Sequence, residues 1–392
     1  MLVLRVAMLT TILALVAPSV ALAAPGDLVS TFGDQGVAFV PGPPSAYAPQ
    51  GWGYSSDDLL LDSQGRLIVV GQSDDRPVVS RLTLSGSPHG AFGKAGYTKH
   101  FEEAMWVGEN NVAIQDDDEI VVSGTSAGIF RFTRLGQPDS AFGDSGWGQL
   151  PYGAAFPVVP VAGGGIVTAV IPGGSRSHAL KLTADGAYDP RYQRDPFASE
   201  SSPHQGAFTS RDGLPLPDGG ITWGGISLTS PSWTGQIWRT DAHGELVPEF
   251  GDQGVTALPE LREVSQVVSV ADGYAVIGPR SAEPGSVGVV RVNADGTVDR
   301  RFGVNGVATL PWGRQLAAQP DRKLVVVGSG GVARLTARGK LDTRFGIDGV
   351  KPAPEPFFGN PAIQISQNDA FVSYSTSATG IYVMRVELGY VG

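Results

Sequence analysis

The chain has 392 residues, of which 42% are hydrophobic and 17% charged, and it contains 54 glycines and 29 prolines. This composition suits many short strands joined by turns and excludes a disordered chain. The formal net charge of −10 without any run of Lys or Arg excludes the basic surface that nucleic acid requires, and the lack of cysteine excludes disulfides and thiolate metal ligands.

Residues 1–23 are typical of an export signal. Arg5 precedes an apolar run at 7–16, and Ala21-Leu22-Ala23 fits a small-x-small cleavage site. We therefore expect cleavage near Ala23 and a mature protein that is periplasmic or extracellular. The apolar run is too short to span a bilayer comfortably, so we expect no stable membrane anchor.

A short motif recurs along the rest of the chain. Phe-Gly-Asp-Gln-Gly-Val occurs at 32–37 and again at 250–255, and other copies keep the pattern Phe-Gly-x-x-Gly. The aromatic residues of these copies are Phe32, Phe92, Phe142, Phe250, Phe302 and Phe345. A degenerate copy has Tyr192 in their place, with Asp189 before it. Self-similarity at a regular period indicates a repeat protein.

A basic residue precedes each aromatic after the first by eleven positions, and one more basic residue follows near the chain end. The seven are Arg81, Arg131, Lys181, Arg239, Arg291, Arg334 and Arg385. Phe32 has no such partner in the mature chain, and Arg385 has no aromatic after it. Joined head to tail, the two ends complete a seventh unit. The mean period of about fifty residues is that of a propeller blade.

Each unit contains four strand signals, which we name A to D in chain order. In the clearest copy these are 315–319, 323–327, 332–336 and 350 onward. The sequence therefore predicts a signal peptide at 1–23 and one all-β domain at 24–392. The domain is a seven-bladed β-propeller of four-stranded antiparallel blades, closed by pairing of 37–40 with 381–387.

These units resemble the delta-60 repeat, a bacterial β-propeller family. Residues 341–349, Leu-Asp-Thr-Arg-Phe-Gly-Ile-Asp-Gly, match its Leu-Asp-x-x-Phe-Gly-x-x-Gly pattern, and 319–323 nearly match its Gln-x-Asp-Gly-Lys turn. In most units an Asp, which we call the corner Asp, lies three residues before the aromatic. Departures from the pattern are Tyr192-Gln193 in place of Phe-Gly, His89 in place of the corner Asp, and insertions in the first and fourth units. The resemblance covers essentially the whole mature chain and implies a fold but no common activity.

Residues that every blade requires are interpreted as structural. The basic residue of strand C is expected to pair with the corner Asp or with a carbonyl at the blade junction. The corner aromatic is expected to wedge between blades, with its two glycines permitting the turn.

Two strings imitate catalytic motifs. The pattern Gly-x-Ser-x-Gly at 124–128 is the nucleophile elbow of hydrolases, but that elbow needs a strand running into a helix, and here strand C follows. Gly-Asp-Ser-Gly at 143–146 resembles a serine-protease motif, but it fills the corner occupied elsewhere by Gly-Asp-Gln-Gly. Both are interpreted as parts of the repeat, and no catalytic residue is predicted.

The acidic run Asp116-Asp117-Asp118-Glu119 could hold a hard cation such as calcium, although it lies at an A–B turn where a solvated acidic hairpin is favoured. The five histidines, His89, His100, His178, His204 and His243, have no metal-binding spacing. The sequence therefore predicts neither a metal nor a cofactor.

Alternation of strand direction places the A–B turns and C–D corners at one end of the propeller, the corner face. The B–C and D–A connections form the other end, the loop face. The span from a corner aromatic to the next basic residue varies from 32 to 49 residues, so variable length belongs to the loop face. Binding surfaces concentrate on such loops. The predicted binding residues there are Trp52, Tyr54, Trp106, Tyr152, Trp233, Trp312 and Arg314.

These observations favour a non-enzymatic binding or scaffold module for a protein or glycan partner on the loop face. The null interpretation is that the aromatics only pack loops against the blades. The alternative function is an extracytoplasmic hydrolase or lyase with its site at the channel mouth on the same face. Its polar residues would be Asp57, Asp74, Arg176, His204 and Arg314.

Overall fold

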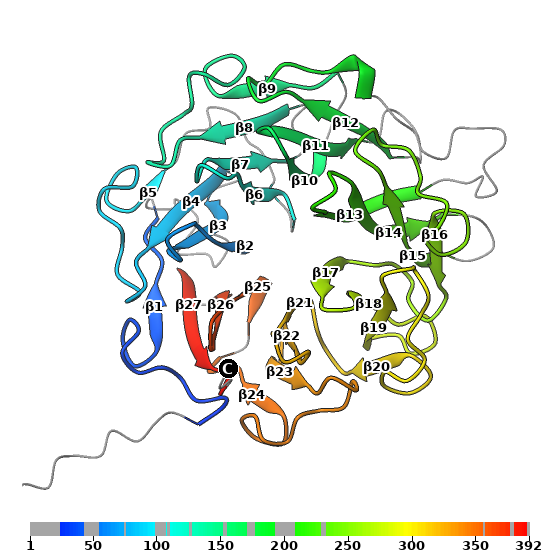
Figure 1. The fold of residues 1–392 in the computed structure, drawn as a ribbon. Helices are drawn as coiled ribbons and strands as arrows, with labels where there is room; N and C mark the ends of the chain where they lie inside the picture. Colours follow the sequence, from blue (N-terminus) through cyan, green and yellow to red (C-terminus); the bar gives the residue numbers. More distant parts are fainter. Residues whose placement is uncertain are drawn as a thin grey trace, which may run out of the picture.

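The computed structural model describes residues 24–42, 55–73, 76–98, 107, 110–124, 128–151, 155–170, 177–192, 208–228, 233–355, 357–376 and 380–389. Within these ranges the chain forms seven antiparallel sheets arranged as blades around a central axis (Figure 1). In each blade, strand A lies next to the axis and the last strand at the rim. The predicted seven-bladed β-propeller is confirmed.

Blade 1 consists of β2 (Ser55–Leu61), β3 (Leu67–Ser73), β4 (Arg76–Leu82) and β5 (Tyr97–Thr98). Blade 2 consists of β6 (Val112–Ile114), β7 (Ile120–Ser123), β8 (Gly128–Phe132) and β9 (Trp147–Gln149). Blade 3 has three strands in the described residues, β10 (Ala155–Val161), β11 (Gly165–Val170) and β12 (His178–Leu182), followed by a 3₁₀ turn at Pro190–Tyr192. Blade 4 consists of β13 (Phe208–Pro215), β14 (Ile221–Ser227), β15 (Thr234–Thr240) and β16 (Val255–Leu258).

Blade 5 consists of β17 (Gln266–Val270), β18 (Gly273–Pro279), β19 (Val287–Asn293) and β20 (Val307–Leu310). Blade 6 consists of β21 (Gln315–Ala318), β22 (Leu324–Gly328), β23 (Gly331–Leu335) and β24 (Val350–Pro352). Blade 7 combines β25 (Phe358–Ser366), β26 (Asp369–Thr376) and β27 (Gly380–Glu387) with β1 (Val37–Phe39). The described residues contain no helix long and apolar enough to cross a membrane.

The ring closes where the N-terminal strand joins the last blade. β1 pairs with β27 in antiparallel register, with Ala38 opposite Val383, and the Val40 N–H donates to the carbonyl of Ile381 at 2.9 Å. Upstream of β1, the Gly26 N–H donates to the carbonyl of Glu387 at 2.8 Å. The predicted closure by the two chain ends is therefore confirmed.

Central strands are buried on both faces because each blade lies between two others. All five residues of β22 and all five of β23 are buried, so these strands consist of valine, leucine and small residues, with Arg334 as the one charged residue. The hydrophobic clusters lie between blades, as where Ile68 of blade 1 meets Val122 of blade 2. Each blade thus shares its core with its neighbours, as repeat architectures require.

In four blades the basic residue of strand C forms a hydrogen bond to the next blade. Arg131 donates to the carbonyl of Ala184 at 2.9 Å, and that carbonyl belongs to the residue three positions after the basic residue of the next blade. The same bond links Arg81 to Arg134, Arg291 to Ala337 and Arg334 to Leu388. Lys181 instead lies over the Tyr192 ring, 5.5 Å from its centroid. These contacts confirm that the residue is structural.

Carboxylates at the corner face neutralise these cations. Arg131 and Arg334 pair with the corner Asp of their own blade, Asp139 at 2.5 Å and Asp342 at 3.0 Å. Other blades use an acid of the A–B turn, which the sequence did not indicate: Arg81 with Asp62, Arg239 with Asp218, Arg291 with Asp272 and Arg385 with Asp369.

The corner aromatics are buried and lie against a glycine of the next blade. Phe302 is 1% exposed, and a Cβ on Gly339 would lie 3.0 Å from its ring and 2.7 Å from the Gly303 nitrogen. Gly339 also has φ +75°, which glycine adopts without strain. The Gly303 N–H donates to the carbonyl of Arg338 at 2.8 Å. The wedge predicted for the aromatics is confirmed.

Polar side chains of strand A join the blades along the channel wall. The Asp212 carboxylate of β13 accepts from the Val267 N–H of β17 at 2.7 Å. The Gln266 carboxamide oxygen in turn accepts from the Leu316 N–H of β21, also at 2.7 Å. Gln315 makes the same contact with Ile363 of β25 at 3.2 Å. Inner and outer contacts together fix the angle between blades.

The two strings that imitate catalytic motifs lie within repeat elements. Gly124 follows β7 and Gly128 begins β8, which pairs antiparallel with β7, so the connection joins two strands. Residues 125–127 of that string lie outside the described residues. Gly143 begins the corner of blade 2, where its N–H donates to the carbonyl of Asp185 at 2.7 Å.

Candidate functional site

The seven predicted binding residues are partly described by the structure. Trp52, Tyr54, Trp106 and Tyr152 lie outside the described residues. Trp233 immediately precedes β15 on the loop face and is 58% exposed. Trp312 and Arg314 lie between β20 and β21, also on the loop face, in blade 6.

Trp312 is half-buried because a short B–C turn makes room for its ring. A Cβ on Gly328 would lie 3.1 Å from the indole, and Gly330 would clash with the indole nitrogen if it carried any side chain. The indole thus covers the turn at 328–330, as expected if this residue only packs a loop against the blade. Trp233 differs, because more than half of its surface faces solvent.

The polar residues named for the alternative function are described only in part. Asp57 is buried at a bulge in the register of β2 and has a partner, and Arg314 is exposed and likewise has one. Asp74, Arg176 and His204 lie outside the described residues. Their convergence at the channel mouth stays a prediction.

Asn110 links distant blades at the start of β6. Its side-chain nitrogen donates to the carbonyls of Arg211 at 3.3 Å and Ser265 at 3.2 Å, in blades 4 and 5. Its own carbonyl accepts from the Val158 N–H of blade 3 at 3.1 Å. The residue has φ +60°, a conformation that asparagine tolerates better than most residues. Asn110 therefore crosses the channel and holds four blades together.

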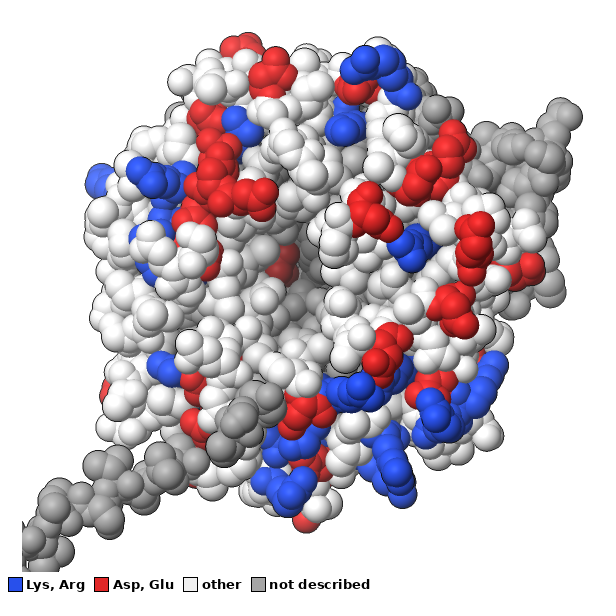
Figure 2. Space-filling view, viewed as in Figure 1, with Lys and Arg blue, Asp and Glu red and all other residues white. Residues whose placement is uncertain are grey.

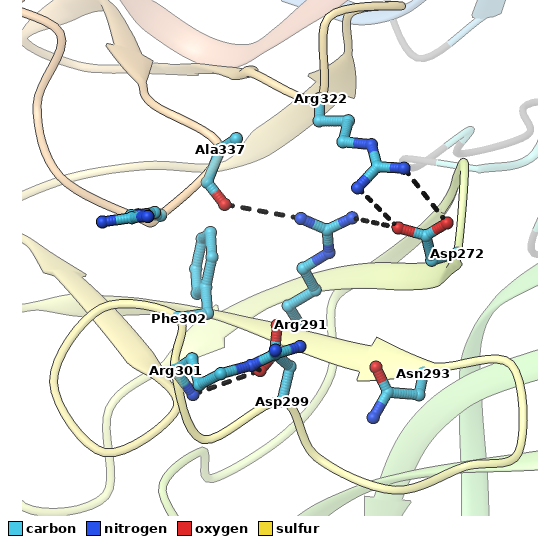
Figure 3. Close-up of a pocket in the computed structure, with 9 residues that line it drawn as sticks. Asp272, Arg291, Asn293, Asp299, Arg301, Phe302, Arg322 and Ala337 are labelled. Atoms are coloured by element: carbon cyan, nitrogen blue, oxygen red, sulfur yellow. Dashed lines mark hydrogen bonds and ion pairs between the residues drawn. The ribbon is translucent and has the colours of Figure 1, made fainter.

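A basic cavity of about 680 Å³ lies on the corner face between blades 5 and 6. Its lining includes four arginines and two aspartates: Arg291, Arg301, Arg322, Arg338, Asp272 and Asp299. As Figure 3 shows, Asp272 forms ion pairs with both Arg291 and Arg322, and the two terminal nitrogens of Arg322 lie 2.9 and 3.3 Å from its carboxylate oxygens.

The second aspartate of this cavity is held ionised by its neighbours. Arg301 pairs with Asp299 at 3.0 Å. Burial of Asp299 opposes its ionisation, but the Arg301 side chain and backbone N–H, with Arg291 nearby, outweigh burial and keep the pKa of Asp299 below its ordinary value. Arg338 has no ion-pair partner in the described part of the chain. The cavity therefore has a net positive charge.

An acidic cavity of about 760 Å³ also opens on the corner face, between the A–B turns of blades 2, 3 and 4. Glu119 pairs there with Arg131 at 3.0 Å. Burial raises the pKa of Glu119, and Asp117 and Asp139 reinforce this shift against the opposing effect of Arg131. A carboxyl group of raised pKa in a cavity is a candidate for proton transfer.

Asp118 of the acidic run serves the fold. Both Asp118 oxygens accept from Ser63 of blade 1, from its N–H at 2.7 Å and its hydroxyl at 2.8 Å. Asp118 has φ +65° at the hairpin. No group of three or more His, Asp or Glu side chains that could hold a metal occurs in the described ranges.

Charge is unevenly distributed over one face of the molecule. Figure 2 shows Lys and Arg side chains most densely gathered over the blades of β17–β24, with fewer elsewhere, and acidic side chains spread over the whole of this face. The sequence predicts binding on the loop face and indicates neither corner-face cavity. The available signal was the number of arginines at 291–344, which repeat spacing alone does not require.

Comparisons with known proteins support the fold. A family model described as a domain of unknown function (DUF5122) beta-propeller matches residues 319–345, which run from the A–B turn of blade 6 to its corner aromatic. No curated protein matches the chain in sequence.

Solved structures resemble the chain over most of its length. A catalytically inactive virginiamycin B lyase from Staphylococcus aureus has 11% identity and a TM-score of 0.52, covering 85% of this chain and 95% of that one. A puromycin hydrolase has 14% identity and a TM-score of 0.51, covering 93% of this chain, which spans 55% of the hydrolase. BamB from Moraxella catarrhalis has 12% identity and a TM-score of 0.45, covering 89% and 99%. At these identities the likeness concerns the fold alone.

Proposed function

We propose that the protein is an exported binding or scaffold module whose partner, a protein or a glycan, docks on the loop face. The observation that carries the proposal is the exposure of Trp233 at the start of β15, where 58% of the side chain faces solvent. Exposed tryptophan is costly in water and is enriched among the residues that anchor binding.

Blade 4 has the means to bury indoles, and it does so with two others. Trp223 of β14 and Trp238 of β15 are 2% and 3% exposed and stack with ring centroids 6.4 Å apart. Trp233 takes no part in that stack. Its exposure therefore serves something other than packing within the blade, and this favours binding over the null interpretation for this residue.

The two ends of the propeller have different tasks, and this division supports the placement of the site. Arginines, aspartates and glycines of the corner face hold neighbouring blades together, as in the bond from Arg131 to Ala184. Connections of variable length belong to the loop face, where changes of sequence do not disturb the junctions.

Export and family membership belong to the same proposal. The signal features at 1–23 support secretion across the inner membrane. We infer that the units are delta-60 repeats, because the residues matched by the propeller family, 319–345, contain the turn at 319–323 and the first five residues of the corner motif at 341–349.

The experiment is photo-crosslinking of the mature protein, residues 24–392, in the secreted and envelope fractions. A photoreactive phenylalanine analogue replaces Trp233 in one variant. In the matched control it replaces Val304, which is 78% exposed on the corner face. A glycan array probed with wild type and Trp233→Ala covers carbohydrate partners.

The proposal expects a discrete adduct, or a glycan signal, that depends on position 233 and not on position 304. Equal labelling at both positions, or neither an adduct nor a glycan signal that the alanine variant removes, would overturn it.

A further inference from the structure

We propose that the basic cavity between blades 5 and 6 is a binding site for an acidic oligosaccharide, on the face opposite to the site proposed above. The first support for this proposal is that several arginines line the cavity. Arg301, Arg322 and Arg338 come from three turns of two blades and line one hollow of about 680 Å³. This volume lies within the usual range of small-ligand sites.

The repeat itself indicates that Arg322 and Arg338 are not needed for folding. The position of Arg322 is filled in other A–B turns by Gly65, Asp118, Gly164 and Gly219. The position of Arg338 is filled in other C–D turns by Ser85, Leu135, Asp185, His243 and Asp295. Arginine occurs at both positions only where blade 5 meets blade 6. A feature that other blades lack, gathered in one hollow, is best explained by a ligand.

Arg322 also adopts an unfavourable backbone conformation at this position. Its φ is +68°, where blades 1, 3 and 4 have glycine. Asp118 has nearly the same φ at this position of blade 2, so the turn accepts residues other than glycine, and the contacts of the Arg322 guanidinium support the proposal. Its bidentate pairing with Asp272 holds the group at the rim of the cavity (Figure 3).

Local charge distinguishes the site from a general attraction for anions. Residues 291–351 contain eleven Lys or Arg against five Asp or Glu, a net charge of +6 in a chain of −10. Because the whole chain repels polyanions, any anion that binds must be attracted by this sector. Guanidinium groups bind carboxylates in bidentate geometry, so a ligand with carboxylates suits this lining.

The remaining lining favours a sugar over a peptide made of acids alone. The Asn293 side-chain nitrogen donates to the Thr297 hydroxyl at 2.8 Å, so its amide oxygen remains to accept from a ligand. Asp272 and Asp299 add further acceptors. Arginine donors beside amide and carboxylate acceptors match a chain of acidic sugars, which presents carboxylates and hydroxyls on every unit.

The test measures binding of trigalacturonic acid by calorimetry, with cellotriose and hexaglutamate as comparison ligands. The cavity variants are Arg322→Gly and Arg301→Gln. Their control is Arg344→Gln, because Arg344 has the same repeat position in blade 6, is 80% exposed, and does not line the cavity. Arg322→Gly places at this turn the residue that three other blades have, so the variant is expected to fold, and thermal melting checks this.

We expect the wild type to bind trigalacturonic acid, more weakly at high salt, and not cellotriose. Each cavity variant should lose at least about tenfold in affinity, and Arg344→Gln and Trp233→Ala should lose little. No binding, or equal losses for Arg344→Gln and the cavity variants, would overturn the proposal. Equal affinity for hexaglutamate would show that the ligand class is wrong. A failure of the loop-face site would leave these results unchanged.

Discussion

Arg131 of β8 donates a hydrogen bond of 2.9 Å to the carbonyl oxygen of Ala184, which lies 53 residues further on in the next blade. The same guanidinium lies 4.5 Å from the centroid of the Phe142 ring in its own blade. One side chain thus orders its own corner and binds its neighbour. Because the bond to the next blade recurs at three further junctions, we expect the corner residues to contribute strongly to stability.

Replacing Phe302 by alanine should lower the free energy of unfolding by about 3 to 5 kcal/mol, as expected for a buried phenylalanine that leaves a cavity. Phe302 is 1% exposed between blades 5 and 6. Urea denaturation measures the effect, with Val304→Ala at the exposed end of the same corner as control. Equal unfolding midpoints for the two variants would contradict the wedge.

Gly339→Ala should destabilise the protein more than Gly163→Ala. Both residues have positive φ, +75° and +82°, so each substitution costs about 1 to 2 kcal/mol in backbone strain. A Cβ at Gly339 would also press on Gly303 and Phe302, whereas at Gly163 it meets nothing within 4 Å. The extra loss should be about 1 kcal/mol or more by urea denaturation. Indistinguishable losses would argue against close contact at the junction.

Acid should weaken the junction between blades 6 and 7 through Asp342. Burial opposes ionisation of this group, but Arg334, the Arg344 N–H and Lys323 outweigh burial and hold the pKa of Asp342 below its ordinary value. A carboxyl group whose pKa is lower in the folded state stabilises fully above its unfolded value of about 3.9. That stability is lost as pH falls through the folded pKa.

The measurement is the free energy of unfolding at a series of pH values for wild type, Asp342→Asn and Asp348→Asn. We expect Asp342→Asn to be less stable near neutrality, because Arg334 loses its partner, and to lose less on acidification. Asp348→Asn removes the same charge from an exposed turn and should behave as wild type. An unchanged acid dependence in Asp342→Asn would show that the ion pair contributes nothing.

A circular permutant should fold. Gly389 lies against the Pro25 ring, so a short linker can join the two ends, and new ends can be opened between Gly163 and Gly164 in an exposed A–B turn. We expect the β-sheet circular dichroism spectrum of the parent and a single unfolding transition. A permutant that is insoluble, or that unfolds in separate steps, would show that chain order contributes more than the pairing of β1 with β27.

The fold was predictable because its junctions use residues at fixed spacing. The spacing of eleven positions from Arg334 to Phe345 is constant because a guanidinium in strand C has to stack on a ring in the corner, here at 4.8 Å. Strand boundaries followed from the turns, so the predicted 315–319 corresponds to β21 at Gln315–Ala318.

The candidate sites were harder to predict because they depend on how blades stack. Arg301, Arg322 and Arg338 lie in three separate turns, and no motif joins them in sequence. Asn110 reaches Ser265 across the channel, 155 residues away, through a contact that periodicity cannot indicate. The choice between a corner Asp and an A–B Asp as the arginine partner likewise depends on local twist.

The separation of charge affects how the molecule approaches a charged surface. Residues 291–351 have a net charge of +6 and the rest of the chain −16, so the ring possesses an electric dipole that lies largely in its own plane. A dipole near a charged wall experiences a torque. Near a negatively charged surface, the protein is expected to orient with the edge formed by blades 5 and 6 toward that surface, before any specific contact forms.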